Sequence, residues 1–285
     1  MKIALLGANG ALSRAFLKYS SFSQFTEPFS RHPHHQYIDF LHPALGLATP
    51  TLFQEYDVIL NTIAMTNMDI CESQPNHAYT INANSISKLL TYINPSSYLI
   101  HISTDMVYDS RQEHFATEDQ TNVPDCIYAS SKYMGEAFAL EHANTIVLRT
   151  NYYGLGINHT FTDSIVAQIL SNQNQPIQGY SDITFTPVSA PSLVKMLDII
   201  ILRRPTGIFN YGCVESISKY DFVAALFQHC LPNGNPSRLR THTSSANWPR
   251  DRYKSLNMSM DSSRIANSTG IELPSLWYDI KNLIK

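Results

Sequence analysis

The chain has 285 residues, 44% of them hydrophobic, so one large domain or two closely packed ones can bury a sizeable core. It carries 20 Lys and Arg against 23 Asp and Glu, whereas a general nucleic-acid binder would show a basic excess. The sequence shows no signal peptide, and its most apolar late run, at 193–202, contains Lys195 and Asp198 and is too short for a bilayer. We therefore expect a cytoplasmic protein that binds neither nucleic acid nor membranes.

Strand and helix patterns alternate along the first half of the chain. Short apolar runs predict strands at 2–6, 57–61, 97–103 and 144–150, and helices are expected within 7–20 and near 72–92 and 127–142. Apolar strands that alternate with helices are typical of a parallel sheet covered on both faces. The expected fold class is therefore α/β, with a Rossmann-like doubly wound parallel sheet.

The second half has shorter strand patterns and more loops. Helix patterns remain at about 160–171, 190–202 and 218–230, and 232–253 is expected to be a long irregular segment. We expect a dinucleotide-binding Rossmann domain at 1–150 and a smaller C-terminal α/β substrate lobe at 151–285. Some segments of the second part are expected to return to the first domain.

The sequence GANG follows the first predicted strand and opens a helix, where a doubly wound fold binds a dinucleotide. Gly7 permits a tight turn, and Gly10 lets the backbone approach a pyrophosphate at the helix N-terminus. The third small position of the pattern is Ser13. We expect Asn9, Ala11 and Leu12 to contact the cofactor as well, although a plain strand-to-helix turn remains the alternative.

Ser30 and Arg31 lie where the second strand should end. At that edge a carboxylate holds the 2′-hydroxyl of NAD and an Arg accepts the 2′-phosphate of NADP. Because Arg31 and no acid stands there, NADPH is favoured, with NADH and a solvated surface Arg left open. Asp39, before Phe40, is expected to contact the adenine or to cap the next helix.

The stretch HISTDMVYD at 101–109 places Ser103, Thr104 and Asp105 at the end of a buried strand, where ligands bind in open α/β sheets. The stretch YASSK follows, and its spacing puts Tyr128 and Lys132 on one helix face. A lysine ammonium beside a phenol, together with the positive charge of an oxidised nicotinamide, is expected to lower the pKa of the phenol, which can then protonate a carbonyl oxygen as hydride arrives. By itself, however, a Tyr-x-x-x-Lys spacing is common.

Several stretches in chain order resemble the dTDP-4-dehydrorhamnose reductase family of the extended short-chain dehydrogenase/reductase superfamily. They are GANGAL at 7–12, NTIAMTNMDICE at 61–72, Asn82, STDMVYD at 103–109, YASSKYMGE at 128–136, LRTNYYG at 148–154 and GIFNYG at 207–212. The resemblance is strong over about 1–160 and thinner afterwards. It implies an NAD(P)H-dependent sugar-nucleotide oxidoreductase.

By this resemblance the catalytic positions are Thr104, Tyr128 and Lys132, with Asp105 beside them in the substrate pocket. The cofactor-contacting positions that the resemblance implies are Gly7, Gly10, Asn61, Ala64 and Lys132, and Arg149 matches a position that supports the site. The expected cofactor is NADPH, the expected partner is a nucleotide sugar, no metal site is expected, and a homodimer is left open.

The substrate side departs from the family pattern. Tyr152 stands where the family commonly has a Trp against the sugar, and the sequence around Asp182 and Pro187 also differs. In the basic segment at 232–253, Arg250 and Arg252 are the favoured ligands for a diphosphate, because Arg meets phosphate with a planar fork. Two alternatives to a 4-keto sugar reductase remain: an NAD-dependent epimerase or dehydratase, and a non-catalytic dinucleotide-binding regulatory subunit.

Overall fold

A seven-stranded sheet, parallel throughout, forms the centre of the protein in the computed structural model, which describes residues 1–31, 34–39, 52–108, 113–120, 124–156, 160–171, 175–243 and 256–283. The strand order is β11-β6-β5-β4-β1-β2-β3. The bounds are Ile3–Leu6 for β1, Thr26–Ser30 for β2, Gln36–Tyr37 for β3, Val58–Asn61 for β4, Tyr98–Thr104 for β5, Thr145–Thr150 for β6 and Gly207–Tyr211 for β11. The expected doubly wound α/β fold is confirmed.

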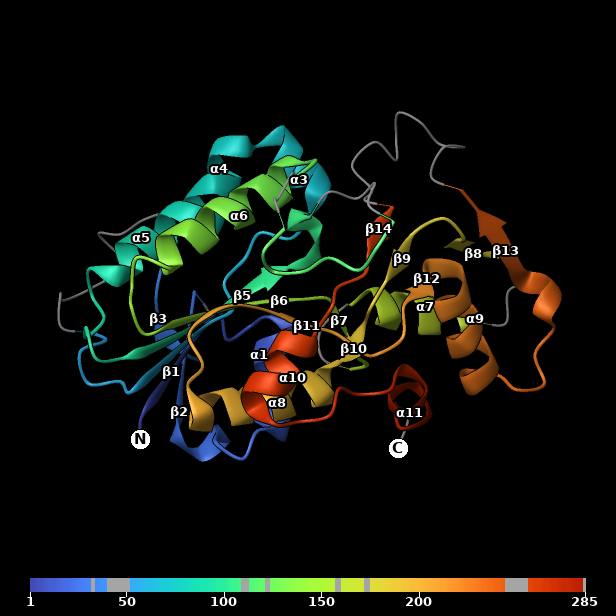
Figure 1. Cartoon of the computed structure of the whole chain (residues 1–285). Coiled ribbons are helices and arrows are strands. Elements are labelled where there is room, and N and C mark those ends of the chain that lie inside the picture. Colours follow the sequence, from blue (N-terminus) through green and yellow to red (C-terminus); the bar gives the residue numbers. More distant parts are fainter. Residues whose placement is uncertain are drawn as a thin grey trace.

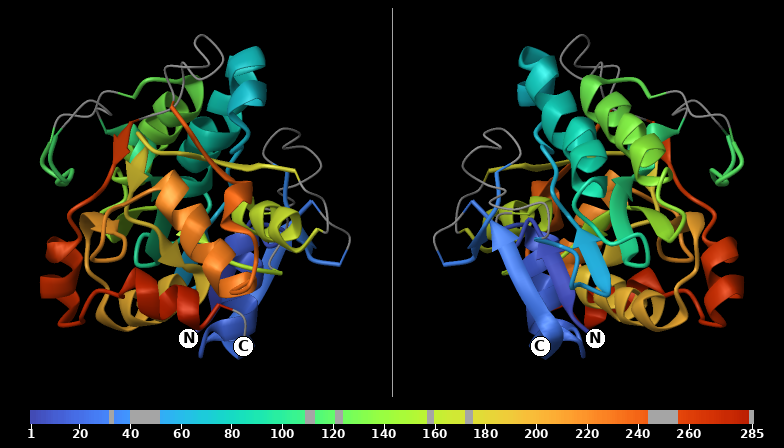
Figure 2. Two further views of the ribbon diagram at one scale, coloured as in Figure 1. Left: turned by 90° about the vertical axis from the view of Figure 1, so that its right-hand side faces the viewer. Right: turned by 90° about the vertical axis from the view of Figure 1, so that its left-hand side faces the viewer.

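Helices cover both faces of this sheet (Figures 1 and 2). One layer holds α3 (Met68–Ser73), α4 (Pro75–Tyr79), α5 (Ser85–Leu90) and α6 (Ile127–Ala139). The other layer holds α1 (Ala11–Tyr19), α8 (Ala190–Arg203) and α10 (Ser263–Thr269). The predicted helix near 72–92 is thus divided, and a π-helical turn at Thr80–Asn84 joins α4 to α5.

Alternation of side chains along β1 explains the two layers. Ile3 and Leu5 belong to the core cluster that includes α1 and α8, whereas Ala4 and Leu6 belong to the cluster that includes α5 and α6. All four side chains are fully buried. A strand that is apolar at every position must be covered on both faces, which is the arrangement of a parallel sheet.

The C-terminal lobe has a separate core under the helices α7 (Phe161–Leu170), α9 (Lys219–Cys230) and α11 (Leu276–Lys281). Figure 1 shows this lobe to the right of the large sheet. Its short strands are β7 (Tyr152–Tyr153), β8 (Ile177–Tyr180), β9 (Thr184–Phe185), β10 (Val188–Ser189), β12 (Ile217–Ser218), β13 (Leu239–His242) and β14 (Asn257–Met258).

Two segments of the second half differ from a simple division at residue 150. β11 joins the large sheet beside β6, as expected for a segment that returns to the first domain. β13 lies inside the segment predicted to be irregular and pairs with β8, so that prediction is wrong for 239–242. The pairing partner lies some sixty residues away, and local sequence carries no sign of it. The domain boundary itself stays a prediction.

In the described part of the chain, every helix is too short or too polar to cross a bilayer.

Candidate active site

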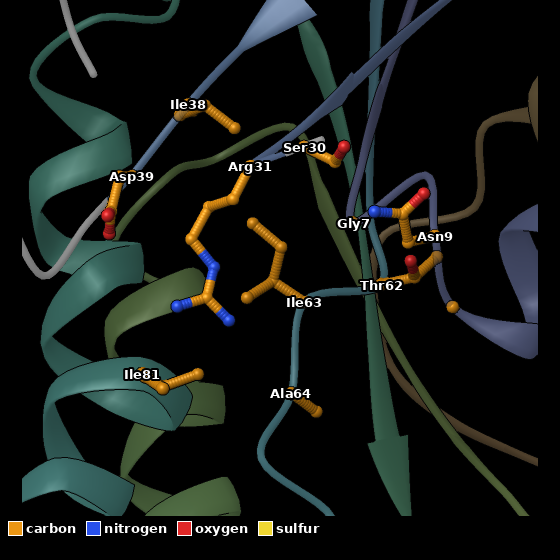
Figure 3. Close-up of a pocket in the computed structure, with 11 residues that line it drawn as sticks. Gly7, Asn9, Ser30, Arg31, Ile38, Asp39, Thr62, Ile63, Ala64 and Ile81 are labelled. Carbon is orange, nitrogen blue, oxygen red and sulfur yellow. The ribbon is translucent and has the colours of Figure 1, made fainter. Parts of the chain in front are cut away.

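The candidate site lies where the strand order reverses, at the carboxyl ends of β1 and β4. The chain runs outward from β1 to β2 and β3, then crosses back so that β4 pairs with the other edge of β1. Ligands of open α/β sheets bind in the crevice at such a switch point. Here the crevice is a cavity of about 250 Å³, shown in Figure 3.

The turn after β1 forms one wall of this cavity. Gly7 adopts a left-handed conformation with φ of +87°, and a Cβ at this position would lie 2.9 Å from Thr62 Oγ1. Gly10 then precedes the first residue of α1, and its N–H donates to the carbonyl of Gly7 at 2.8 Å. Ser13 is fully buried and forms a 2.7 Å hydrogen bond with Thr62 Oγ1. The turn therefore packs tightly on β4 and faces the cavity with backbone, as a pyrophosphate site requires.

The far edge of the cavity carries both a cation and a carboxylate. Ser30, Arg31 and Asp39 line it together with Ile38. Figure 3 shows the Arg31 side chain extending across the opening beside Ile63 toward Ile81. Arg31 is exposed, whereas Asp39 is 5% exposed. The sequence favoured NADPH because no acid lies beside Arg31 at the end of β2. Asp39, after β3, nevertheless lines the same cavity as Arg31. The predicted contact at Phe40 lies outside the described residues.

Two asparagines hold the loop after β4, which forms the third wall. Asn61 accepts a hydrogen bond from the Ile63 N–H at 3.1 Å and shares another with the buried ring of His101. Asn82 accepts from the Met65 N–H at 2.7 Å and donates to the Met65 carbonyl and to Ser131. Asn82 lies in the π-helical turn, a distortion that often marks functional sites. The loop is thus fixed at both ends, with Ala64 between them.

A second cavity adjoins the first, because Thr62 and Ala64 line both. It is lined by the three predicted catalytic residues, Thr104, Tyr128 and Lys132, and by two predicted substrate residues, Asp105 and Tyr152. β5 delivers Thr104 at its end, α6 presents Tyr128 and Lys132 one turn apart, and β7 contributes Tyr152. The structure therefore brings together the residues that the sequence assigned to catalysis, and Leu12 of the cofactor turn also reaches this cavity.

The electrostatics at Tyr128 differ from the expectation. Burial raises the pKa of the Tyr128 phenol, the Thr104 hydroxyl bonded to it lowers that pKa, and the Asp105 carboxylate raises it further. Lys132 is not among the groups that shift this pKa in the protein alone, and the lowering expected with an oxidised nicotinamide beside the phenol stays a prediction. Instead, Nζ of Lys132 donates to the Ile102 carbonyl at 2.6 Å. A raised pKa keeps the phenol protonated, which is the form that donates a proton.

Lys132 is itself 2% exposed, and its burial lowers the pKa of the ammonium to about 8, although Glu136 opposes that shift. Glu136 lies one further turn along α6 and forms an ion pair with Arg149 of β6. The side chains of Tyr128, Lys132 and Glu136 thus follow one face of α6. Arg149, which the resemblance assigned to support of the site, contacts Glu136 and lines neither of the two cavities.

Several cavity residues were not among those predicted. Thr62, Ile63, Ile81, Thr66 and Asn151 line the two cavities. Thr62 and Asn151 each follow a buried strand directly, and that position was a usable signal. By contrast, Arg238 donates to the carbonyls of Gln168 and Ile169 near the end of α7, so it secures that helix and is not a free phosphate ligand. Arg250 and Arg252 lie outside the described residues.

A dinucleotide-type crevice continuous with a Tyr–Lys pair on a doubly wound sheet defines an oxidoreductase of the short-chain dehydrogenase/reductase class. Within that class, residues 1–285 match the family described as the RmlD substrate binding domain, and the chain belongs to this family. The resemblance found in the sequence is therefore confirmed, and with it the expected class of sugar-nucleotide reductase.

Individual relatives agree with this assignment. The dTDP-4-dehydrorhamnose reductase of Aggregatibacter actinomycetemcomitans is 26% identical over 232 residues, covering 78% of each chain. A dTDP-4-dehydrorhamnose reductase structure from Clostridium acetobutylicum superposes with a TM-score of 0.83 at 23% identity, covering 100% of this chain and 98% of that one. The Bacillus anthracis enzyme, solved in complex with NADP, gives a TM-score of 0.82 at 19% identity over 99% and 98%.

Proposed function

We propose that the protein uses NADPH to reduce the 4-keto group of a nucleotide-linked sugar, with Tyr128 as the proton donor. The observation that carries this proposal is the convergence of Thr104, Tyr128 and Lys132 in a cavity continuous with the Gly7 turn. A ketone bound there would meet the Thr104 hydroxyl, the protonated Tyr128 phenol and the Lys132 ammonium. The turn lies at the other end, where a dinucleotide fits.

The chain's own residues have distinct tasks in this scheme. Thr104 holds the carbonyl oxygen, and Tyr128 gives that oxygen its proton as the carbonyl carbon becomes tetrahedral. Lys132 holds the ribose hydroxyls and stabilises the phenolate left behind. NADPH supplies the hydride when it is bound. At neutral pH the Tyr128 phenol is in its acid form, which is the form that reduction of a carbonyl requires.

The residues of the first cavity fit a phosphorylated dinucleotide. Its pyrophosphate meets the Gly7–Gly10 turn, where a side chain at Gly7 would collide with Thr62. Arg31 is the one arginine that lines the cavity in the described part of the chain, and it accounts for a preference for the 2′-phosphate. Ser30, Asn9 and Ala64 line the same cavity and complete this cofactor set, and Asn61 supports it by holding the loop after β4.

On the substrate side, the proposal assigns the sugar to Asp105 and Tyr152 and the diphosphate to Arg250 and Arg252. Asp105 is 1% exposed and already accepts hydrogen bonds from Asn151 and Thr104, so its orientation is fixed. Tyr152 is half-buried against the Leu12 backbone, with its ring at the cavity.

We expect this reductase to act in the cytoplasm, and sedimentation would show whether it is a homodimer.

The direct test is oxidation of NADPH with a panel of nucleotide 4-keto sugars that includes dTDP-4-dehydrorhamnose. We expect turnover with at least one of them, and a loss of about 10²–10⁴-fold in Tyr128→Phe, which removes one oxygen and keeps the ring. NADPH binding should survive in this variant. Normal turnover by Tyr128→Phe would rule out the phenol as the proton donor.

One observation favours a second candidate, an epimerase or dehydratase. Asp105 lines the same cavity as Tyr128 and is a second group able to move a proton, and burial raises the pKa of its carboxyl. Such enzymes regenerate their cofactor in each cycle. Stoichiometry separates the two candidates: a reductase consumes one NADPH for each sugar converted, and an epimerase or dehydratase consumes none.

A further inference from the structure

Asn151 lies where the chain leaves the large sheet for the C-terminal lobe. It follows the last residue of β6 and precedes β7, and its backbone carbonyl accepts a hydrogen bond from the Val188 N–H at 3.0 Å. The residue lines the cavity that also contains Tyr128. Backbone contacts thus hold this asparagine at the proposed site of reaction.

The amide group of Asn151 contacts the carboxyl group of Asp105, which directly follows β5. Nδ2 of Asn151 donates to Oδ2 of Asp105 at 2.6 Å, and the Thr104 hydroxyl donates to Oδ1 at 3.1 Å. Each oxygen of Asp105 therefore accepts a hydrogen bond, and a carboxylate is the form that accepts at both oxygens. The contact also joins the ends of two neighbouring strands, because β5 pairs with β6.

Asp105 depends on such donors because it is almost completely buried. Burial raises the pKa of its carboxyl group, and the hydrogen bond from Asn151 is the largest of the effects that lower this pKa. The other charged or titratable groups around Asp105 in the described part of the chain are Lys219 of α9, Tyr128 and Lys132 of α6, and Tyr152 of β7. Lys219 lowers the same pKa, but less than Asn151 does.

An ionised Asp105 suits a sugar hydroxyl as its ligand. A carboxylate oxygen has two acceptor sites, and the bonds from Asn151 and Thr104 use one on each oxygen. The remaining sites can accept from a hydroxyl in the cavity that all three residues line, whereas the negative charge would repel a phosphate. Protonation of Asp105 would remove the charge that strengthens this hydrogen bond.

We propose that Asn151 is a positioning residue that holds Asp105 as a carboxylate, turned to accept a hydrogen bond from a hydroxyl of the sugar ring. Asn151 thereby sets the pH range over which the sugar is held beside Tyr128. This inference rests on the proposed function and deepens it, since it names the residue that controls the sugar-binding carboxylate.

Two substitutions of Asn151 test the proposal, because they should respond to pH in opposite directions. Asn151→Asp places a second carboxyl group against Asp105. At low pH the two groups share one proton and reproduce the hydrogen bond, whereas at high pH both are charged and repel each other. Asn151→Ala removes the donor without adding a charge, so Asp105 takes up a proton at a higher pH than in the wild type.

Titration calorimetry with dTDP-rhamnose from about pH 5 to about pH 9 gives the Kd of each variant relative to the wild type, and this ratio cancels the ionisation of the ligand's own phosphates. For Asn151→Asp, we expect a ratio near one at the acid end and a rise to roughly tenfold or more at the alkaline end, since a hydrogen bond to a charged group is lost. The ratio for Asn151→Ala should instead be largest at the acid end.

Two controls separate this role from a general loss of structure. The ligand dTDP lacks the sugar, so both variants should bind it as the wild type does at each pH. Asn76→Asp is the same change at an exposed position that lines neither cavity of the candidate site, and its ratio should stay near one throughout. Circular dichroism at each pH shows whether a variant is folded, and if one of the two is not, the pH trend of the other decides.

A purely structural role for Asn151 predicts ratios that are independent of pH or that change in the same direction in both variants. Either result would overturn the proposal, and so would equal weakening of dTDP and dTDP-rhamnose. The outcome for the proposed function is read separately. If the wild type binds dTDP-rhamnose but oxidises no NADPH with the keto sugars, the reductase proposal fails while the ratios still decide the role of Asn151. If the wild type reduces a keto sugar and the ratios do not change with pH, the role of Asn151 fails and the reductase stands.

Discussion

Arg149 and Glu136 form an ion pair sealed inside the protein, with 2.6 Å between Nη2 and Oε2 and side-chain exposures of 0% and 1%. Nε of Arg149 donates to both carboxylate oxygens, Nη1 donates to the Tyr108 hydroxyl, and Ser103 donates to Glu136. The pair thus joins α6 to the ends of β5 and β6. It fixes the backbone around Lys132 and Thr104, although neither partner lines either of the two cavities of the candidate site.

Breaking this pair should destabilise the whole protein. Glu136→Gln leaves the Arg149 guanidinium buried without a counter-charge, and removing one partner of a buried pair costs about 3–5 kcal/mol. We expect a fall of that size in the free energy of unfolding measured in urea. Glu141→Gln, a matched change at an exposed position on the same segment, should stay within about 0.5 kcal/mol of the wild type. Equal stability of the two variants would contradict the structural role of the pair.

The sequence predicted the central sheet well, because its strands carry their own signal. β1, β4, β5 and β6 are buried at every position and each contains at least three consecutive apolar residues, which is typical of a strand covered on both faces. β13 carries no such pattern: it alternates little, two of its side chains are exposed, and it exists because β8 offers an edge. Short edge strands depend on a distant partner and not on local propensity.

The candidate site divides in the same way. Turn geometry, strand ends and helical spacing predicted that Gly7, Thr104, Tyr128 and Lys132 lie at the site, and the family resemblance assigned the last three to catalysis. Ile81 could not be found in this manner, because its place at the first cavity depends on how the turn Thr80–Asn84 packs in the folded protein. The raised pKa of Tyr128 was missed because helical spacing does not show how deeply a side chain is buried, and burial is the largest cause of the rise.

Arg31 should govern the choice between the two nicotinamide cofactors. Arg31→Ala removes the cation that would meet the 2′-phosphate, so the Kd of NADPH should rise roughly tenfold or more while that of NADH changes little. Asp39→Asn serves as the matched change on the same cavity, and it should weaken NADH more than NADPH if the carboxylate holds a ribose hydroxyl. Fluorescence titration gives both constants. An unchanged ratio in Arg31→Ala would remove the argument for NADPH.

Cofactor binding should weaken as the pH rises through about 8. The sign follows from Lys132: its lowered pKa leaves the amine charged below that value and neutral above it, and a neutral amine holds the ribose less well. The Kd of NADPH measured from pH 6.5 to 9.5, a range of about 1.5 units on either side of the shifted pKa, should rise on the alkaline side. A flat profile in the wild type would show that the Lys132 charge is not needed for binding.

Arg250 and Arg252 are expected to hold the diphosphate, and the other arginines of the same basic segment serve as controls. Arg240 is exposed and donates to the carbonyl of Leu239, so Arg240→Ala should leave substrate binding alone. Arg250→Ala or Arg252→Ala should raise the Michaelis constant for the sugar nucleotide roughly tenfold or more, since a charge-assisted contact contributes about 1.5–3 kcal/mol. These variants should weaken the binding of dTDP as much as that of dTDP-rhamnose, because both molecules carry the diphosphate. If both variants bind dTDP normally, or if they weaken NADPH to the same extent, the diphosphate is held by other residues.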